Sequence, residues 1–222
     1  FHSFYYFYLD TPTEYHHVHA SSPEILLIAK RMFVYIQTDD DGFAPCSQNG
    51  LHTLATCKKD IRLHAEPGDK VVGLMSQVLG KMCERTPQSM IWCATVDRKI
   101  TLQQYHLEFP DRSDCIYDNN LEYIDNPYHI AGDTKNIRKD KAGKYVLIMK
   151  DFHRFSDNEV DGSVLLAGKN ITQGYVKHPV MSELQHIIEQ SGGNRLFGTP
   201  DKAREERVRD YENPTKMIAG KP

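Results

Sequence analysis

The sequence predicts a small α+β domain built on a curved sheet or a partly open barrel with short flanking helices. Short apolar runs rich in β-branched and aromatic residues recur along the chain, and stretches with helical spacing lie between and after them. The chain has 222 residues, with a hydrophobic fraction of 40% and a charged fraction of 26%, both close to globular averages. This length suits one domain with extensions better than two full domains.

Four apolar runs predict buried strands, and turn residues separate them. Asp39-Asp40-Asp41-Gly42 ends the first run, and Pro67-Gly68-Asp69 leads into the second. A fifth strand is expected at Val164–Ala167. The four runs are Phe33–Ile36, Lys70–Met75, Met90–Val96 and Tyr145–Met149, the last continuing to Phe155.

Three short helices and two loops complete the expected elements. Thr101 caps one or two helical turns through Leu107, and an amphipathic helix through Ile188 ends before Gly192-Gly193. A further amphipathic helix is expected because Leu54, Cys57, Ile61 and Ala65 recur at helical spacing. The segments Gln77–Ser89 and Phe109–Lys144 are expected to be loops, and a polar loop as long as the second is typically functional or disordered.

The chain divides into three parts by composition. Residues 1–31 are crowded with aromatic residues and histidines and contain no Met, which favours an N-terminal extension that need not be native. Residues 32–200 carry the predicted strands and helices and form the domain. Residues 201–222 are highly charged, which predicts a solvated tail or helix.

Charge and cysteine usage exclude several classes of protein. With 27 basic and 30 acidic residues the net charge is -3, so no global field attracts nucleic acid, and any contact would be local. The 5 cysteines form no C-x-x-C pair, which argues against a disulfide framework and a zinc ribbon. No apolar run approaches the length that crosses a bilayer, so we expect a cytoplasmic protein without a membrane partner.

The best-marked nucleotide, zinc and hydrolase motifs are absent from the sequence. It has no Walker loop, no dinucleotide-binding glycine motif, no H-E-x-x-H helix and no nucleophile elbow. His16, His17 and His19 lie in the suspected extension, so no metal site is expected. The sequence identifies no cofactor.

Polar and reactive side chains are densest between Thr38 and Gln77. Cys57 beside two lysines is a candidate nucleophile, because neighbouring ammonium groups lower the pKa of a thiol; alternatively it is a small buried apolar residue. Lys58 and Arg62, four apart on the expected helix, are candidate phosphate ligands or part of an ordinary solvated face.

Three other residues are candidate catalytic groups. Asp41 is a candidate general base or cation ligand, although a run of aspartates before glycine more often forms a turn. Asp151 directly follows a buried strand, where catalytic groups are frequent. His129 lies in the long polar segment and is a candidate acid or base, with an ordinary surface histidine as the alternative.

Several short motifs, taken in order, resemble the second family of nucleotide modification associated domains. They include Asp41-Gly42-Phe43-Ala44-Pro45, Leu54 to Arg62, Gly68 to Gly73, Asp114 to Asp118, Val146 to Phe155 and Gly198-Thr199-Pro200. The resemblance covers about Met32 to Pro200 and implies a role in DNA base modification in phages and bacteria. Two positions depart from the pattern: Lys59 stands where Pro is expected, and Arg154 replaces an aromatic residue.

A further resemblance concerns modified-base-binding domains with a PUA-like barrel, in which a pocket holds one flipped base. It implies base contacts from Phe43, Trp92 and Tyr35. The leading hypothesis is a protein that acts on a nucleotide or nucleobase in a DNA-modification system, together with other proteins of that system. The alternatives are a non-catalytic PUA-like reader of a modified base and an adaptor that docks through Thr199–Glu212. DNA is the favoured partner; RNA and nucleotide monomers stay open.

Overall fold

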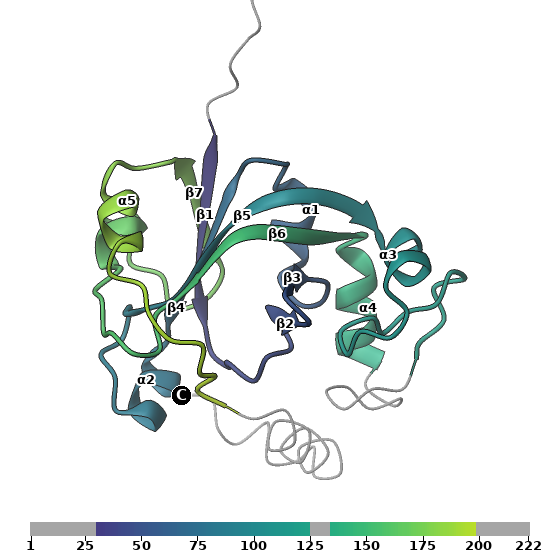
Figure 1. The fold of residues 1–222 in the computed structure, drawn as a ribbon, viewed down its shortest axis with the longest axis horizontal. Helices are drawn as coiled ribbons and strands as arrows, with labels where there is room; N and C mark the ends of the chain where they lie inside the picture. Colours follow the sequence, from purple (N-terminus) through teal and green to yellow (C-terminus); the bar gives the residue numbers. More distant parts are fainter. Residues whose placement is uncertain (1–29, 125–133, 199–222) are drawn as a thin grey trace, which may run out of the picture.

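The computed structural model describes residues 30–124 and 134–198. Its seven strands are β1 (Arg31–Gln37), β2 (Cys46–Gln48), β3 (Leu51–Leu54), β4 (Lys70–Met75), β5 (Met90–Thr101), β6 (Tyr145–Arg154) and β7 (Tyr175–Pro179). They form one sheet in the order β2-β3-β6-β5-β4-β1-β7 (Figure 1). β1 and β4 run parallel, and the other neighbours are antiparallel. The prediction of an α+β fold with a curved, open sheet is confirmed; the PUA-like likeness stays a prediction.

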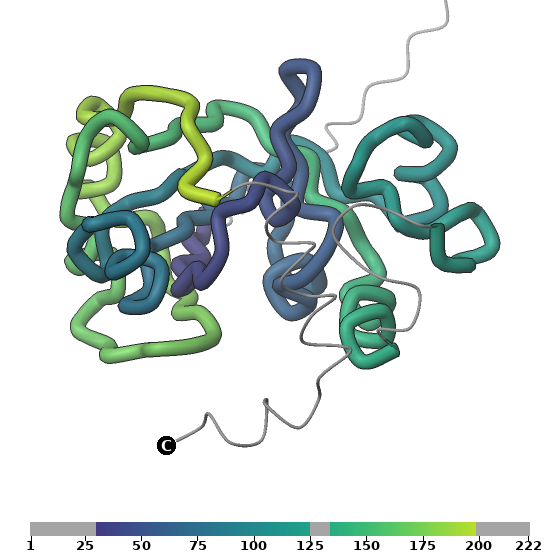
Figure 2. Tube along the Cα trace, turned by 90° about the horizontal axis from the view of Figure 1, so that it is seen from below, coloured from purple at the N-terminus to yellow at the C-terminus, as the bar shows by residue number. Residues whose placement is uncertain are grey.

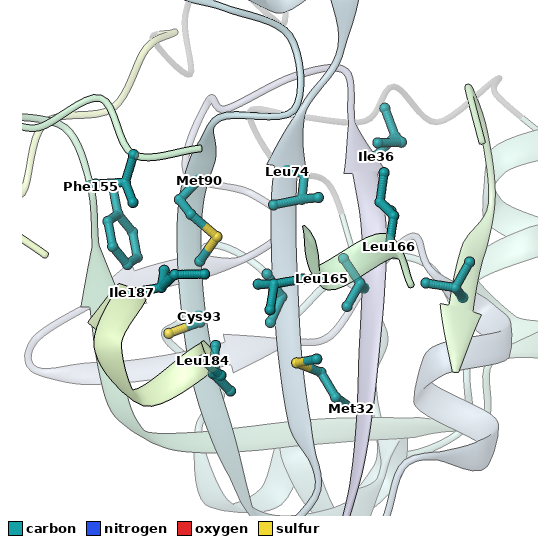
Figure 3. Packing of buried hydrophobic residues seen from close by; sticks show 14 residues of the cluster. Met32, Ile36, Leu74, Met90, Cys93, Phe155, Leu165, Leu166, Leu184 and Ile187 are labelled. Atoms are coloured by element: carbon teal, nitrogen blue, oxygen red, sulfur yellow. The ribbon is translucent and has the colours of Figure 1, made fainter. Parts of the chain in front are cut away.

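Both faces of the sheet carry a hydrophobic core. One face is covered by the 3-10 helix η1 (Ser163–Leu166) and by helix α5 (Glu183–Ile188). Figure 3 shows Leu74 and Met90 of the sheet in one cluster with Ile187 of α5. The other face packs against α1 (Lys59–His64) and α2 (Gln77–Cys83), with Tyr35 and Trp92 among its buried side chains.

The four principal predicted strands are confirmed as β1, β4, β5 and β6. Helix α3 (Leu102–Glu108) begins where predicted: the Thr101 hydroxyl accepts a hydrogen bond from the Gln104 N–H at 3.1 Å, and the Gln104 side chain accepts from the Thr101 N–H at 2.9 Å. Helix α5 lies within the predicted amphipathic segment.

Two predictions of local structure are wrong. Residues 164–166 form η1 instead of a strand, because Leu165 and Leu166 both turn inward and Ala167 then adopts the left-handed conformation. The first half of the expected loop 77–89 is helix α2, capped by the Ser76 hydroxyl. Its exposed Val78 and Met82 obscure the apolar stripe that would have predicted it.

The polar segment 109–144 also contains a helix, α4 (Thr134–Ala142). Its one buried residue among those described is Asp140, so the helix carries no hydrophobic period for sequence reasoning to detect. α4 packs against α1, as the tube view of Figure 2 also shows.

The helix expected from Leu54 onward is only partly correct. β3 ends at Leu54, and α1 begins five residues later. Between them Cys57 and Lys58 have left-handed backbones, with φ of 52° and 31°, which keeps the helix from starting earlier.

Four predictions fall wholly or mostly outside the described residues: the extension over residues 1–31, of which only the last two are described, His129, the docking segment Thr199–Glu212, and the charged tail over residues 201–222. Among the helices of the described ranges, none has the length and apolar character needed to cross a bilayer.

Candidate functional site

A cavity of about 420 Å³ lies where β1 ends, and its walls come from segments far apart in the sequence. The segment before β2, the turn after β3 and the start of β7 all contribute, so both edges of the open sheet reach the same cavity. It is lined by Gln37, Thr38, Asp39, Asp41, Phe43, Ala44, Cys57, Lys58, Lys59, Asp60, Ile61, Asn136, Lys139, Gly174 and Tyr175. Four residues singled out from the sequence, Asp41, Phe43, Cys57 and Lys58, are therefore brought together.

The turn of Cys57 and Lys58 is the most unusual backbone in this wall. Two consecutive residues other than glycine occupy the left-handed region, which costs about 1 kcal/mol or more for each. The Cys57 N–H donates to Asp140 Oδ1 at 2.5 Å, and the Cys57 carbonyl accepts from Arg62 Nε at 3.0 Å. These buried partners hold the turn in its strained shape.

Arg62 is fully buried and does not line the cavity. Besides the Cys57 carbonyl, its guanidinium donates to the carbonyls of Ala55 at 2.5 Å, Tyr145 at 2.9 Å and Asp140 at 2.6 Å. A Cβ at Gly143 would collide with this guanidinium, so glycine there makes the room. The expected pair of phosphate ligands is therefore split: Lys58 faces the cavity, and Arg62 braces the turn behind it.

The Lys58 ammonium lies 4.3 Å from the centre of the Tyr35 ring, which attracts a cation through its π face. Burial is the largest influence on this group and lowers the pKa of Lys58 below its ordinary value. Cys57 opposes that shift, the Lys139 ammonium adds to it, and Asp39 opposes it. The site thus holds a partly desolvated cation that a bound anion would stabilise.

The three aspartates after β1 have three different environments. Asp40 is buried in an ion pair with Arg154, at 2.7 Å between Oδ2 and Nη1. Asp41 Oδ1 accepts from the Phe43 N–H at 3.0 Å, as expected for an aspartate in a turn, and Asp41 also lines the cavity. Asp39 is exposed at the cavity wall.

Gln37 lines the cavity, and its side chain is the centre of a buried hydrogen-bond network. The Gln37 side-chain oxygen accepts from the Tyr35 hydroxyl at 2.7 Å and from Trp92 Nε1 at 2.8 Å. Its amide nitrogen donates to the Asp39 carbonyl and to Asp40 Oδ1. All three aromatic residues expected to contact a base are buried, with Phe43 1% exposed, and of the three only Phe43 lines the cavity.

Asp151 does not belong to this wall. It sits at a bulge of β6 with φ of 47°, and its Oδ2 accepts from the Thr95 hydroxyl at 3.1 Å. The same hydroxyl accepts from Lys70 Nζ at 2.6 Å. Because Lys70 alternates with Val71, whose side chain belongs to the core on the cavity side, this polar group lies on the opposite face of the sheet.

Several residues of the wall were missed by sequence reasoning, among them Tyr175, Asn136 and Lys139. Tyr175 begins β7, a short edge strand without an apolar run, and Asn136 and Lys139 belong to the polar helix α4. A helix-forming stretch near residue 135 was the available signal for the last two. Within residues 30–124 and 134–198, no group of three or more His, Cys, Asp and Glu side chains is arranged to hold a metal ion.

Comparisons with known proteins agree with the resemblance seen in the motifs. Residues 29–207 match the family described as nucleotide modification associated domain 2. The searches of curated proteins and of solved structures gave no significant match. The match spans most of the chain and contains the whole cavity wall. The chain therefore belongs to the nucleotide modification associated domain 2 family.

Proposed function

We propose that this protein acts on a nucleotide or nucleobase in a DNA-modification system and binds it in the cavity at the end of β1. The observation that carries the proposal is the strained turn of Cys57 and Lys58, which presents a thiol and an ammonium group to that cavity. Strained backbones of this kind cluster at functional sites, because the surrounding structure has to maintain them. The family description supports the association with nucleotide modification.

Each role follows from the position of the side chain. Lys58 engages phosphate, because a half-buried cation gains most from a bound anion. Phe43 and Tyr175 supply apolar and aromatic surface for the base. Cys57 is the candidate nucleophile and Asp41 the candidate general base. Arg62 positions the turn and does not contact the ligand.

The remaining assignments rest on the sequence alone. Asp151 and His129 stay predicted catalytic groups, Asp151 on the far face of the sheet and His129 outside the described residues. A base contact from Tyr35 or Trp92 would require the Gln37 network to open. The bacterial or phage setting, the cytoplasmic location and the partnership with other modification proteins belong to the same proposal.

A non-catalytic reader of a modified base is the second candidate. The observation that favours it is the presence of both Phe43 and Tyr175 in the cavity wall, since aromatic side chains can hold a base by stacking. A reader needs no nucleophile. Cys57→Ser would therefore leave a reader active and would abolish turnover in an enzyme that uses the thiolate.

The test is a mass-spectrometric nucleoside profile of DNA from cells that express the protein with its genomic neighbours. We compare the wild type, Cys57→Ser and, as a matched control, Cys83→Ser, since Cys83 is also partly exposed but does not line the cavity. A new or missing nucleoside that depends on Cys57 and not on Cys83 supports the enzyme. An unchanged profile with all three proteins contradicts it and favours the reader.

A further inference from the structure

Three lysines and three aspartates line the cavity. The lysines come from the turn before α1, from α1 itself and from α4, whereas two of the three aspartates come from the segment after β1. The lysines are Lys58, Lys59 and Lys139, and the aspartates are Asp39, Asp41 and Asp60. Cys57 and Tyr175 complete the ionisable groups that line the cavity.

Two of these lysines, Lys58 and Lys139, influence each other electrostatically. Lys59 lies 3.9 Å from Asp60 of its own helix. Lys58 and Lys139 both line the cavity and come from two elements, the turn before α1 and helix α4, which the hydrogen bond from the Cys57 N–H to Asp140 joins. The Lys139 ammonium disfavours the charged form of Lys58, so the two positive charges repel each other across the cavity. Asp39 offsets part of this repulsion.

A ligand with two negative charges on one group relieves such a repulsion better than a ligand with one. A terminal phosphate monoester carries about -1.5 to -2 charges near neutral pH, with a second pKa of about 6. An internal phosphate of a nucleic-acid strand is a diester and carries one charge. The cavity of about 420 Å³ is also at the small end of the range for ligand pockets, which suits a single nucleotide.

We propose that Lys58 and Lys139 together bind the terminal phosphate monoester of a mononucleotide, and that the ligand of this cavity is therefore a nucleotide monomer and not an internal residue of a strand. This inference rests on the proposed function and specifies its substrate class. It also accounts for the net charge of -3, which provides no global attraction for a polyanionic strand.

The experiment is isothermal titration calorimetry with three forms of each of the four common deoxynucleosides. They are the 5′-monophosphate, its 5′-phosphate methyl ester, which keeps a single charge, and the nucleoside alone; a single-stranded oligonucleotide is the fourth ligand. We expect the methyl ester of the preferred base to bind about tenfold more weakly than its monophosphate. That gap should grow between about pH 5 and pH 7.5, as the monophosphate gains its second charge. The methyl ester, measured at each pH, corrects for titration of the protein's own groups.

Two variants locate the effect. Lys139→Met should remove most of the gap between monophosphate and ester, whereas Lys135→Met, one turn earlier on the exposed surface of α4 and outside the cavity lining, should keep it. Ester or oligonucleotide binding as tight as that of the monophosphate overturns the inference and leaves the proposed function standing. Binding of none of the four ligands to the wild type overturns both.

Discussion

Two buried arginines, Arg62 and Arg112, illustrate how differently this fold uses the same side chain. Arg112 donates to side chains, the Tyr105 hydroxyl at 2.6 Å, the Thr53 hydroxyl at 2.8 Å and Asp114 Oδ1 at 3.2 Å, as well as to two carbonyls. The Arg62 guanidinium donates to four backbone carbonyls, and one of them belongs to the strained residue Cys57.

The difference separates an arginine that holds the fold from one that holds a site. The Arg112 network joins β3 to the segment after α3, and its members have ordinary backbones. The Arg62 contacts keep two left-handed residues facing a cavity. We therefore assign Arg62, whose guanidinium bonds a strained turn, a role in positioning the site. We assign Arg112, which forms an ion pair with Asp114, a role in holding the fold, because loss of one partner of a buried ion pair is strongly destabilising.

The largest effect is expected at Asp114. Asp114→Ala leaves the Arg112 guanidinium buried without its carboxylate, and such a change costs about 3–5 kcal/mol of unfolding free energy. Chemical denaturation followed by circular dichroism measures it. Protein that remains folded should bind nucleotide as the wild type does. A loss below about 1 kcal/mol would show that the Arg112 network does not hold the fold.

Arg62→Lys is expected to lower the unfolding free energy less than Asp114→Ala does. It should also lower nucleotide affinity strongly. Lysine keeps the charge and cannot reach all four carbonyls, so we expect a cost of about 2–3 kcal/mol from unsatisfied buried groups. Because the turn of Cys57 and Lys58 is released, nucleotide affinity should fall as well. Arg112→Lys is the matched control, which should lose stability and keep affinity. Equal effects of both variants on affinity would erase the distinction between the two arginines.

The smallest effect on stability is expected for Lys58→Met, which should stabilise the protein, whereas the two preceding substitutions should destabilise it. Burial lowers the pKa of Lys58, so the folded protein bears a cost whenever this ammonium is protonated. Lys58→Met should raise the unfolding free energy by about 0.5–1 kcal/mol near neutral pH, while nucleotide affinity falls about tenfold.

The pH dependence checks this explanation. The unfolded chain binds more protons than the folded protein between the lowered pKa and the ordinary value of 10.5, so wild-type stability rises with pH there. Wild type and Lys58→Met should therefore converge in alkaline solution in denaturation experiments. Lys81→Met, at an exposed position of α2, should change neither property. A Lys58→Met variant less stable than the wild type would contradict the cost of burial.

The strands that make up the sheet could be predicted because their residues are apolar and β-branched, as in Phe33–Ile36 and Tyr145–Met149. Part of the site could be predicted as well. Reactive side chains are densest between two glycine-containing turns, and this density indicated Cys57 and Lys58. The role of Arg62 could not be predicted, because helical spacing placed it beside Lys58. Lys58 instead belongs to a left-handed turn before the helix, and such a turn has no sequence signature without glycine.

The far wall of the cavity was beyond sequence reasoning for another reason. Tyr175 begins the edge strand β7 and Lys139 belongs to helix α4, so both reach the cavity through the curvature of the open sheet and the packing of α4 against α1. That curvature arises from long-range pairing, such as the ten-residue β6 along the twelve-residue β5, and no local pattern encodes it.

The thiols of the protein provide a probe inside the cavity and another outside it. Burial raises the pKa of Cys93 to about 12 and the pKa of Cys46 and of Cys115 to about 11. These three thiols stay protonated at about pH 8 and should resist iodoacetamide. Cys57 and Cys83 are partly exposed and should react first.

The most direct test of the central claim, that the cavity beside Cys57 is the nucleotide site, is the alkylation rate of Cys57 with and without saturating nucleotide, followed by peptide mass spectrometry. Cys83 in the same molecule is the internal control, because it lies outside the cavity lining. We predict that a bound mononucleotide slows alkylation of Cys57 about tenfold or more and leaves the rate at Cys83 unchanged. Unchanged alkylation of Cys57 under conditions in which calorimetry shows saturation would place the nucleotide elsewhere and contradict the account.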